Sequence, residues 1–279
     1  MSVVSNANSV NRLAAPAPDR KTLERLYGRY NKRRYIATDP LRFVYRYERQ
    51  RDREVAALVA SSLAFGKVNQ IQRSVERILR PMGNHPADYL LDASSKTLKV
   101  DFRGFKHRWV SGDDMASLLT GVRNAIREYG SLKELFYAKL ETLDPDIVPA
   151  ASRFAEDIFS RSGGFNSCLL PSPRGKSACK KLNLFLRWMV RCDEVDPGGW
   201  NEVPPSMLIV PLDVHMHRIS RQLGLTKRLA ADLKTAREIT GGFKRVAPED
   251  PVKYDFALTR LGILRGDDDT ERDRARLYC

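Results

Sequence analysis

The sequence predicts an all-α protein. Apolar residues recur at helical spacing along most of the chain, and residues that start or stop helices bound most of these stretches. No alternating apolar and polar stretch of four or more residues lies between turn residues, so strands are not expected. Hydrophobic residues make up 42% of the 279 residues, which excludes wholesale disorder. We expect a disordered Ser/Asn/Ala/Pro-rich tail at residues 1–19 and one globular helical unit at residues 20–279.

Three helices are expected in the first half of the chain. Glu54–Phe65 is rich in apolar residues and is followed by Gly66, an expected glycine C-cap. Val68–Leu79 repeats apolar residues every three or four positions, which is typical of an amphipathic helix. Asp113–Tyr129 begins with two acidic residues and ends at Gly130, an order that suits the helix dipole.

Further helices are expected in the second half of the chain, separated by two loops rich in Gly, Ser and Pro at residues 162–177 and 193–212. The expected helices are Leu132–Leu143, Asp144–Ser162, Ala178–Arg191, Asp213–Leu223, Asp232–Phe243 and Asp250–Leu264. The last three of them open with an Asp, whose carboxylate can accept hydrogen bonds from the free N–H groups of the first turn.

The charge of the chain points to a polyanionic partner. The sequence contains 48 Lys and Arg against 34 Asp and Glu, which gives a formal net charge of +14. A basic surface attracts polyanions, and nucleic acid is the most common of these inside a cell. The alternative is a solvated basic surface with no binding role.

Cysteine usage and hydropathy favour a reducing, cytoplasmic setting. No run of about 18 apolar residues is present, so we expect no transmembrane helix and no membrane partner. The N-terminus lacks the basic and apolar blocks of a secretion signal. The cysteines at positions 168, 179, 192 and 279 are too few and too irregularly spaced for a disulfide framework. They are not clustered as the ligands of an iron–sulfur centre are.

The most informative segment is Met207–Leu225. In it, Pro211 ends an apolar approach, and Asp213 stands where the next helix should begin. The Asp213 carboxylate can act as a plain N-cap, or it can also be held, partly desolvated, at the mouth of a cleft. The residues alone leave both interpretations open.

This segment resembles the V-D-x-H-x-x-R-x-x-x-R-L-G-L segment of the helix-hairpin-helix DNA glycosylases, the superfamily of endonuclease III. Asp213, His215, Arg218 and residues 223–225 are in register with it. In that family the Asp is the catalytic carboxylate at a helix N-terminus. The resemblance therefore implies that Asp213 is catalytic and that His215 and Arg218 contact DNA or the base.

Two other segments extend the resemblance. Leu58–Gln70 is similar to the early helix-turn-helix of the family, where a residue near Phe65 lines the base pocket or wedges into DNA, with Lys67 beside it. Residues 170–178 occupy the place of the hairpin, which usually reads L-P-G-V-G-x-x-T-A. Only four of its positions superpose, so the hairpin is degenerate, and its expected DNA contacts are Arg174, Gly175 and Lys176.

The bifunctional members of the family place a nucleophilic Lys on the helix after the hairpin. Here Lys180 and Lys181 stand 33 and 32 residues before Asp213, a separation similar to that of the archaeal 8-oxoguanine glycosylases. The segment Cys179–Met189 is also similar to C-K-R-L-N-x-F-L-R-W-M, found in an uncharacterised bacterial family that shares P-L-D-x-H and D-P-V-K-Y-D-F-A-L. Because that pattern has Lys and then Arg, Lys180 is the favoured nucleophile; the alternative is an ordinary exposed Lys.

The proposed chemistry needs this pair of side chains. Cleavage of an N-glycosidic bond builds positive charge on the sugar, which a carboxylate stabilises. A neutral Lys amine can attack C1′, and a carboxylate can accept the proton that the amine loses. The base must first leave the stack, which requires a pocket.

Several further residues are candidate contacts, each with a plainer alternative. Arg187 can bind phosphate or belong to a solvated face, Trp188 can stack on a base or fill the core, and Asp255 can line the pocket or cap a helix. Phe105–Trp109 interleaves aromatic and cationic groups like a nucleic-acid contact, although a helix-terminal core aromatic pair is the more common explanation of such a segment. His215 and His217 point to different sides of a helix, so no zinc site is expected.

The resemblance implies a two-lobed DNA-glycosylase-like fold, with a middle lobe at about residues 55–180 and a second lobe made of residues 20–54 and 181–279. It implies a DNA repair glycosylase, with an oxidised purine as the first substrate and AP lyase as a second activity. We expect a nucleoid-associated monomer that binds damaged duplex DNA without sequence preference and uses no cofactor or metal. The alternatives are a non-catalytic nucleic-acid-binding protein of the same fold and an α-helical protein-interaction scaffold.

Overall fold

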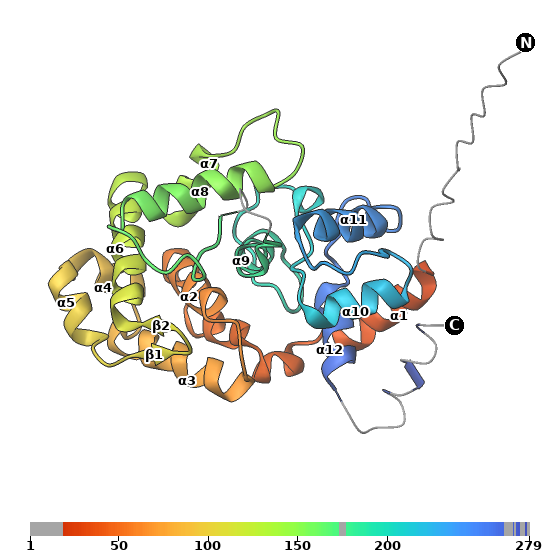
Figure 1. Ribbon diagram of the computed structural model, residues 1–279, viewed down its shortest axis with the longest axis horizontal. Helices are drawn as coiled ribbons and strands as arrows, with labels where there is room; N and C mark the ends of the chain where they lie inside the picture. Colours follow the sequence, from red (N-terminus) through yellow and green to blue (C-terminus); the bar gives the residue numbers. More distant parts are fainter. Residues whose placement is uncertain (1–18, 173–176, 265–269, 271, 274–276, 278–279) are drawn as a thin grey trace, which may run out of the picture.

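The computed structural model describes residues 19–172, 177–264, 270, 272–273 and 277, and these residues form a predominantly helical protein (Figure 1). The α-helices are α1 Arg20–Tyr30, α2 Gln50–Ser62, α3 Val68–Leu79, α4 Pro86–Asp92, α5 Ser95–Asp101, α6 Gly112–Tyr129, α7 Leu132–Ala138, α8 Val148–Ser160, α9 Lys180–Val190, α10 Val214–Gln222, α11 Leu233–Lys244 and α12 Asp255–Ile263. Short 3-10 helices lie at Arg33–Thr38, Pro40–Arg46, Arg80–Met82 and Pro205–Met207. The helical fold class is confirmed.

Helices with local start and stop signals have the predicted bounds or nearly so. The bounds of α3 are the predicted ones, and α6 begins one residue earlier than predicted. A capping box between Ser111 and Asp114 starts α6, and Gly130, at φ 90°, ends it. Asp213 and Asp232 are the N-caps of α10 and α11, as predicted. The tail expected at residues 1–19 lies outside the described residues except for Asp19, which caps α1.

Four predicted helices are wrong at one end or both. The helix expected to run to Leu143 ends at Ala138, and the next begins at Val148 rather than Asp144. The last helix begins at Asp255 rather than Asp250, because the Asp250 carboxylate is bound to the Arg191 guanidinium instead of to a helix N-terminus. Gly66 is not the C-cap of α2, since that helix already ends at Ser62.

A short β-hairpin, which was not expected, connects α5 and α6. Strand β1, Lys106–His107, pairs antiparallel with β2, Val110–Ser111. The segment Phe105–Trp109 therefore is not a helix-terminal core aromatic pair: Phe105 is buried, whereas Trp109 is 57% exposed at the tip of the hairpin. Each strand is only two residues long, which is too short to produce a recognisable alternation of apolar and polar residues in the sequence.

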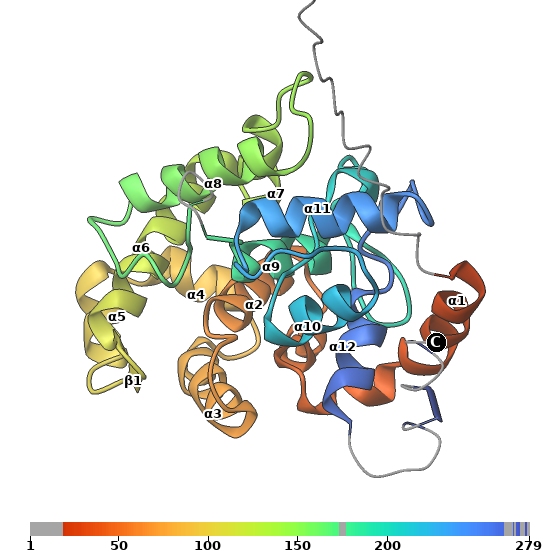
Figure 2. The same ribbon diagram turned by 45° about the vertical axis from the view of Figure 1, so that its right-hand side comes forward.

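Helix α9 lies at the centre of the molecule and organises the core around it (Figures 1 and 2). It packs against α2, and most of its side chains are buried all round the helix. Helix α1 packs on α12, so the two ends of the described chain meet on the same side. The division into two lobes at the predicted residues stays a prediction. Within the described residues, no helix combines the length and apolar composition that a membrane span requires.

Candidate active site

Lys180, the first residue of α9, and Asp213, the N-cap of α10, face each other. The Lys180 Nζ lies 3.4 Å from Asp213 Oδ2, and the two side chains are 34% and 19% exposed. The other carboxylate oxygen, Oδ1, accepts from the backbone N–H groups of His215 and Met216, both at 2.9 Å. Asp213 thus caps α10 with one oxygen and pairs with Lys180 through the other, so the capping role leaves it available for chemistry.

The backbone before Lys180 is in an unusual conformation. Cys179 is left-handed, with φ 48° and ψ 38°, and its side chain is buried. Among the described residues, only Cys179 and Arg108 have a positive φ without being glycine. Such a conformation costs roughly 1–2 kcal/mol for an L residue, and residues of this kind cluster at functional sites. Cys179 directly precedes Lys180, and Arg108 lies in the turn between β1 and β2.

Lys181 has different surroundings from its neighbour. Its Nζ donates a hydrogen bond to the carbonyl oxygen of Cys168 and lies 3.8 Å from the centroid of the Phe65 ring. Burial lowers the pKa of Lys181 to about 8, and the charge of Lys180 acts in the same direction. The two adjacent lysines are therefore distinct: Lys180 pairs with the carboxylate, and Lys181 belongs to an aromatic cluster.

That aromatic cluster consists of Phe65, His107 and Trp109. The Phe65 ring centroid lies 4.5 Å from that of His107, edge to face, and 5.4 Å from that of Trp109. His107 is fully buried, and its Nε2 lies 3.0 Å from the Phe65 carbonyl oxygen. Because a carbonyl can only accept, Nε2 carries a proton, and Nδ1 accepts from the Ser74 hydroxyl at 2.8 Å. Burial lowers the pKa of His107, which favours this neutral form.

The predicted DNA contacts of Arg187 and Trp188 are wrong. Trp188 is fully buried in the core, and Arg187 is only 3% exposed. The Arg187 guanidinium pairs with Asp196, at 3.0 Å, and with Asp255. An exposed phosphate therefore cannot reach Arg187 without opening this buried pairing, which costs several kcal/mol.

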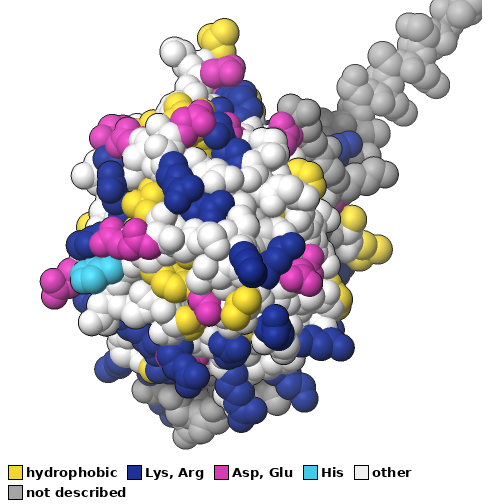
Figure 3. Space-filling model, turned by 90° about the vertical axis from the view of Figure 1, so that its left-hand side faces the viewer, with side chains coloured by type: hydrophobic (Ala, Val, Ile, Leu, Met, Phe, Trp, Pro, Cys, Tyr) yellow, Lys and Arg dark blue, Asp and Glu magenta, His cyan; other side chains and the backbone are white. Residues whose placement is uncertain are grey.

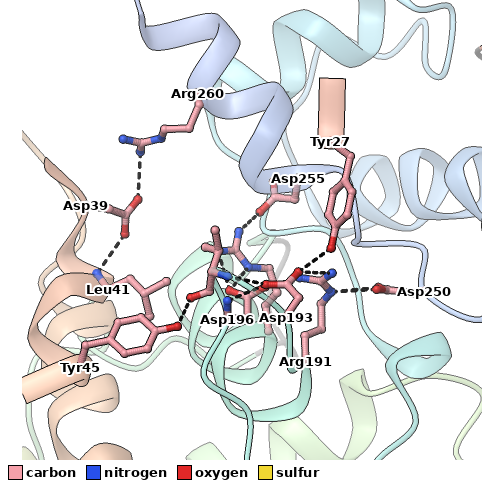
Figure 4. Close-up of polar contacts among 12 residues, drawn as sticks. Tyr27, Asp39, Leu41, Tyr45, Arg191, Asp193, Asp196, Asp250, Asp255 and Arg260 are labelled. Carbon is pink, nitrogen blue, oxygen red and sulfur yellow. Dashed lines mark hydrogen bonds and ion pairs between the residues drawn. The ribbon is translucent and has the colours of Figure 1, made fainter. Parts of the chain in front are cut away.

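Arg187 belongs to a buried ionic network, in which Figure 4 labels Arg191, Asp196 and Asp255 among others. Arg191 pairs with Asp196, with Asp193 at 2.8 Å and with Asp250 at 3.0 Å. These contacts tie α9 to the loop that follows it and to the segment before α12. The network therefore fixes the position of α9, and with it the position of the two lysines at its start.

Asp255, a predicted base contact, is a buried member of this network. Burial raises the pKa of Asp255 to about 6; Arg187 opposes that effect, and the nearby Asp213 carboxylate adds to it. Asp255 is thus close enough to Asp213 to influence it electrostatically.

Several exposed cations lie on α10, whose N-cap is Asp213, and next to the residues of the aromatic cluster in sequence. Lys67 and Arg218, both predicted contacts, are exposed and have no ion-pair partner in the part of the chain that the structure describes; the same holds for Arg108 and Arg221. Arg218 and Arg221 line a depression of about 400 Å³ on α10, together with Val214, His217 and Gln222. Lys and Arg side chains also gather toward the lower edge of the face shown in Figure 3, at the height where Figure 1 draws α3 and the hairpin.

The remaining predicted contacts are His215 and the three residues of the degenerate hairpin. His215 is half-buried in the first turn of α10. Arg174, Gly175 and Lys176, the predicted hairpin contacts, lie outside the described residues. No three His, Cys, Asp or Glu side chains of the described ranges come together in a way that could hold a metal ion. Sequence reasoning did not select Arg108 and Trp109 as site residues, although the interleaved aromatic and cationic groups of their segment were a usable signal.

Comparisons with curated proteins and with solved structures return no match. One protein-family model does match the chain, and it covers residues 39–264, from the 3-10 helix before α2 to the end of α12. This range includes Lys180, Asp213 and the aromatic cluster. The chain therefore belongs to the family described as "Protein of unknown function (DUF2400)".

Proposed function

We propose that this protein is a DNA N-glycosylase that removes a damaged base, with an oxidised purine as the first substrate to test, and that it also has AP lyase activity. The observation that supports this most directly is the 3.4 Å approach of Lys180 Nζ to Asp213 Oδ2. An amine and a carboxylate in contact, both partly exposed, are the two groups that displacement of a base by an amine requires.

The reaction would proceed by attack on the sugar. Lys180 attacks as the neutral amine, and Asp213 accepts the proton that its nitrogen loses once it is bonded to the sugar. In the attack, the nitrogen lone pair forms a bond to C1′ while the C1′–N bond to the base breaks. The electron pair of that bond leaves with the base, which takes up a proton. Before it accepts the proton, the Asp213 carboxylate also stabilises the positive charge that develops on the sugar.

The lyase step would follow from the same covalent intermediate. Loss of a second proton from the nitrogen and opening of the sugar ring at O4′ give an imine. Removal of a C2′ proton then expels the 3′ phosphate with the electron pair of its C–O bond. The strand is nicked, and hydrolysis of the imine releases Lys180.

Lys180 is preferred over Lys181 as the nucleophile because of geometry. Lys181 Nζ is turned toward the Cys168 carbonyl oxygen and the Phe65 ring, whereas Lys180 Nζ faces the carboxylate. The lowered pKa of Lys181 is the one property that favours the other assignment. The experiment below separates the two.

The test is borohydride trapping on duplexes that each carry one damaged base. Hydride reduces the imine to a stable amine, so an adduct reports the covalent intermediate. We expect an adduct with the wild-type protein and with Lys181→Gln, and none with Lys180→Gln. The two variants are matched controls, since each removes one of two adjacent amines.

Three other outcomes have definite meanings. An adduct lost only in Lys181→Gln would transfer the nucleophile role to Lys181. DNA binding that weakens steeply with salt, without an adduct on any lesion, would replace the proposal with a non-catalytic nucleic-acid-binding protein. Absence of DNA binding would leave the protein-interaction scaffold.

A further inference from the structure

Trp109 is an exposed aromatic side chain next to the candidate active site. It is 57% exposed, whereas the other two Trp residues of the chain, Trp188 and Trp200, are fully buried. An exposed Trp is unusual because a large apolar side chain gains most when it is removed from water. Its position therefore needs a reason other than packing.

The turn that presents Trp109 is strained. Pairing of His107 with Val110 leaves Arg108 and Trp109 as a two-residue hairpin turn, and Arg108 has φ 57°. Turns of this kind favour Gly or Asn at a left-handed position. Arg in its place costs roughly 1–2 kcal/mol. The fold thus carries a conformational cost at the residue that sets the direction of the Trp109 side chain.

Three contacts hold the Trp109 ring in place, and the Arg108 guanidinium carbon, 5.0 Å from the ring centroid, makes one of them. The Trp109 indole N–H lies 3.1 Å from the Cys168 sulfur, and its ring is inclined by 32° to that of Phe65 at a centroid distance of 5.4 Å. Cys168 and Phe65 are also the two residues that contact Lys181. Trp109 is therefore connected to the start of α9 by two independent routes, although it is distant in sequence.

Phe65 itself is poorly suited to contact DNA. Its ring is half-buried and is already contacted by Lys181, His107 and Trp109. Trp109 is the member of this cluster that is still available to a ligand. A flat, exposed and orientated aromatic ring beside exposed cations is the arrangement that binds unpaired bases, which stack through their π faces.

We propose that Trp109 stacks on the unpaired base that is presented to Lys180, and that Arg108 contacts the adjoining phosphate. This inference rests on the proposed function and names the residue that would contact the base. The ligand is recognised by two separable features: a base that stacks and a phosphate that carries charge.

The experiment compares two single strands of equal length: ordinary DNA and a strand built from abasic tetrahydrofuran units. Both have the same phosphate charge, so the ratio of their affinities, measured by fluorescence anisotropy of an end label, isolates the contribution of the bases. We expect the wild-type protein to bind the base-containing strand about tenfold more tightly, since stacking on one aromatic side chain contributes about 1–3 kcal/mol. Trp109→Ala should reduce this ratio to near one, and Trp109→Phe should retain most of it.

Two control variants separate stacking from charge and from exposed apolar area. Arg108→Ala should weaken the binding of both strands, because both carry the phosphate, and most of the ratio should remain, because Cys168 and Phe65 still hold the Trp109 ring. Leu143→Ala, which shortens an apolar side chain that is 92% exposed between α7 and α8, should leave both affinities unchanged. Because Trp109 is the one exposed Trp, its emission should also be quenched by the base-containing strand and not by the abasic strand.

A ratio that persists in Trp109→Ala would overturn the inference, even if Lys180 forms a trapped adduct. A ratio that depends on Trp109 in a protein that forms no adduct would instead overturn the glycosylase proposal and leave base stacking in place. Failure to bind either strand would overturn both.

Discussion

Asp213 uses its two carboxylate oxygens for different purposes. Oδ1 accepts from two backbone N–H groups of α10, and Oδ2 faces Lys180. The first role requires an oxygen acceptor, and the second requires a negative charge. A substitution that keeps the acceptor and removes the charge therefore separates structure from chemistry.

Asp213→Asn is that substitution. Asn is about as good an N-cap as Asp, so we expect the free energy of unfolding to change by less than about 1 kcal/mol. The trapping rate should fall about a hundredfold or more, because the proton acceptor of the reaction is lost. Asp213→Ala should lose the same activity and an additional ~1 kcal/mol of stability from the cap. Urea unfolding and single-turnover trapping measure the two effects, and an active Asn variant would remove Asp213 from the mechanism.

The lowered pKa of Lys181 has a consequence for stability. In the unfolded chain a Lys amine keeps its proton up to about pH 10.4, whereas in the folded protein the Lys181 pKa is about 8. Between these values the unfolded state binds more protons, so the contribution of Lys181 to stability falls as the pH drops from about 10 to 8 and is constant below that.

Lys181→Met removes this dependence. Relative to wild type, the variant should be most favoured at pH 7 and should lose that relative advantage as the pH is raised to 10. Urea unfolding at pH 7, 8.5 and 10 tests the sign of the change, which does not depend on the hydrogen bond lost to Cys168. Lys67→Met, at an exposed position, controls for the general loss of one charge. A parallel pH dependence in wild type and Lys181→Met would contradict the lowered pKa.

Helix boundaries were predicted correctly where residues that are close in sequence set them. Helix α3 and the N-caps Asp213 and Asp232 were predictable because the residues that set them are neighbours in sequence. Asp250 has the same residue type but is bound to Arg191, 59 positions away, so no local pattern could reveal that α12 begins later. The approach of Lys180 to Asp213 has the same long range, and the expectation of it came from the family resemblance rather than from spacing.

The turn between β1 and β2 carries backbone strain at Arg108, which a substitution can relieve. Arg108→Gly places the residue that tolerates a positive φ at the strained turn, and we expect the free energy of unfolding to rise by about 1 kcal/mol. In a chain of this size, that corresponds to an increase of about 2 °C in the melting temperature. The same variant should bind DNA more weakly. Calorimetry measures the first effect and anisotropy the second; a destabilised Gly variant would contradict the strain.

For the whole molecule, the net charge of the sequence differs from the charge that the surface presents to a ligand. The formal charge of +14 counts every Arg alike, including Arg187 and Arg191, whose charges are compensated by buried carboxylates in one network (Figure 4). This is why sequence reasoning placed Arg187 among the DNA contacts. Only exposed cations without a carboxylate partner can exchange counterions for phosphates, so the relevant charges are those near Lys67, Arg108 and α10.

Salt dependence measures how many of these cations bind phosphate. For duplex DNA the logarithm of the affinity falls linearly with the logarithm of salt concentration, with a slope of about −0.9 per phosphate contacted. Arg218→Ala should therefore reduce the magnitude of the slope by about one and weaken binding to all sequences alike. Its melting temperature should stay unchanged, since Arg218 is exposed and unpaired within the described residues.

The matched control is Lys99→Ala on α5, at the end of the molecule opposite α10 in Figure 1. It removes the same formal charge, and Lys99 is likewise exposed and has no ion-pair partner in the part of the chain that the structure describes. If net charge alone attracts DNA, both variants will shift the affinity equally. If α10 borders the binding surface, only Arg218→Ala will change the slope. Equal slopes in wild type and Arg218→Ala would place the DNA elsewhere on the protein, away from Asp213, and the glycosylase proposal would then lose its geometric basis.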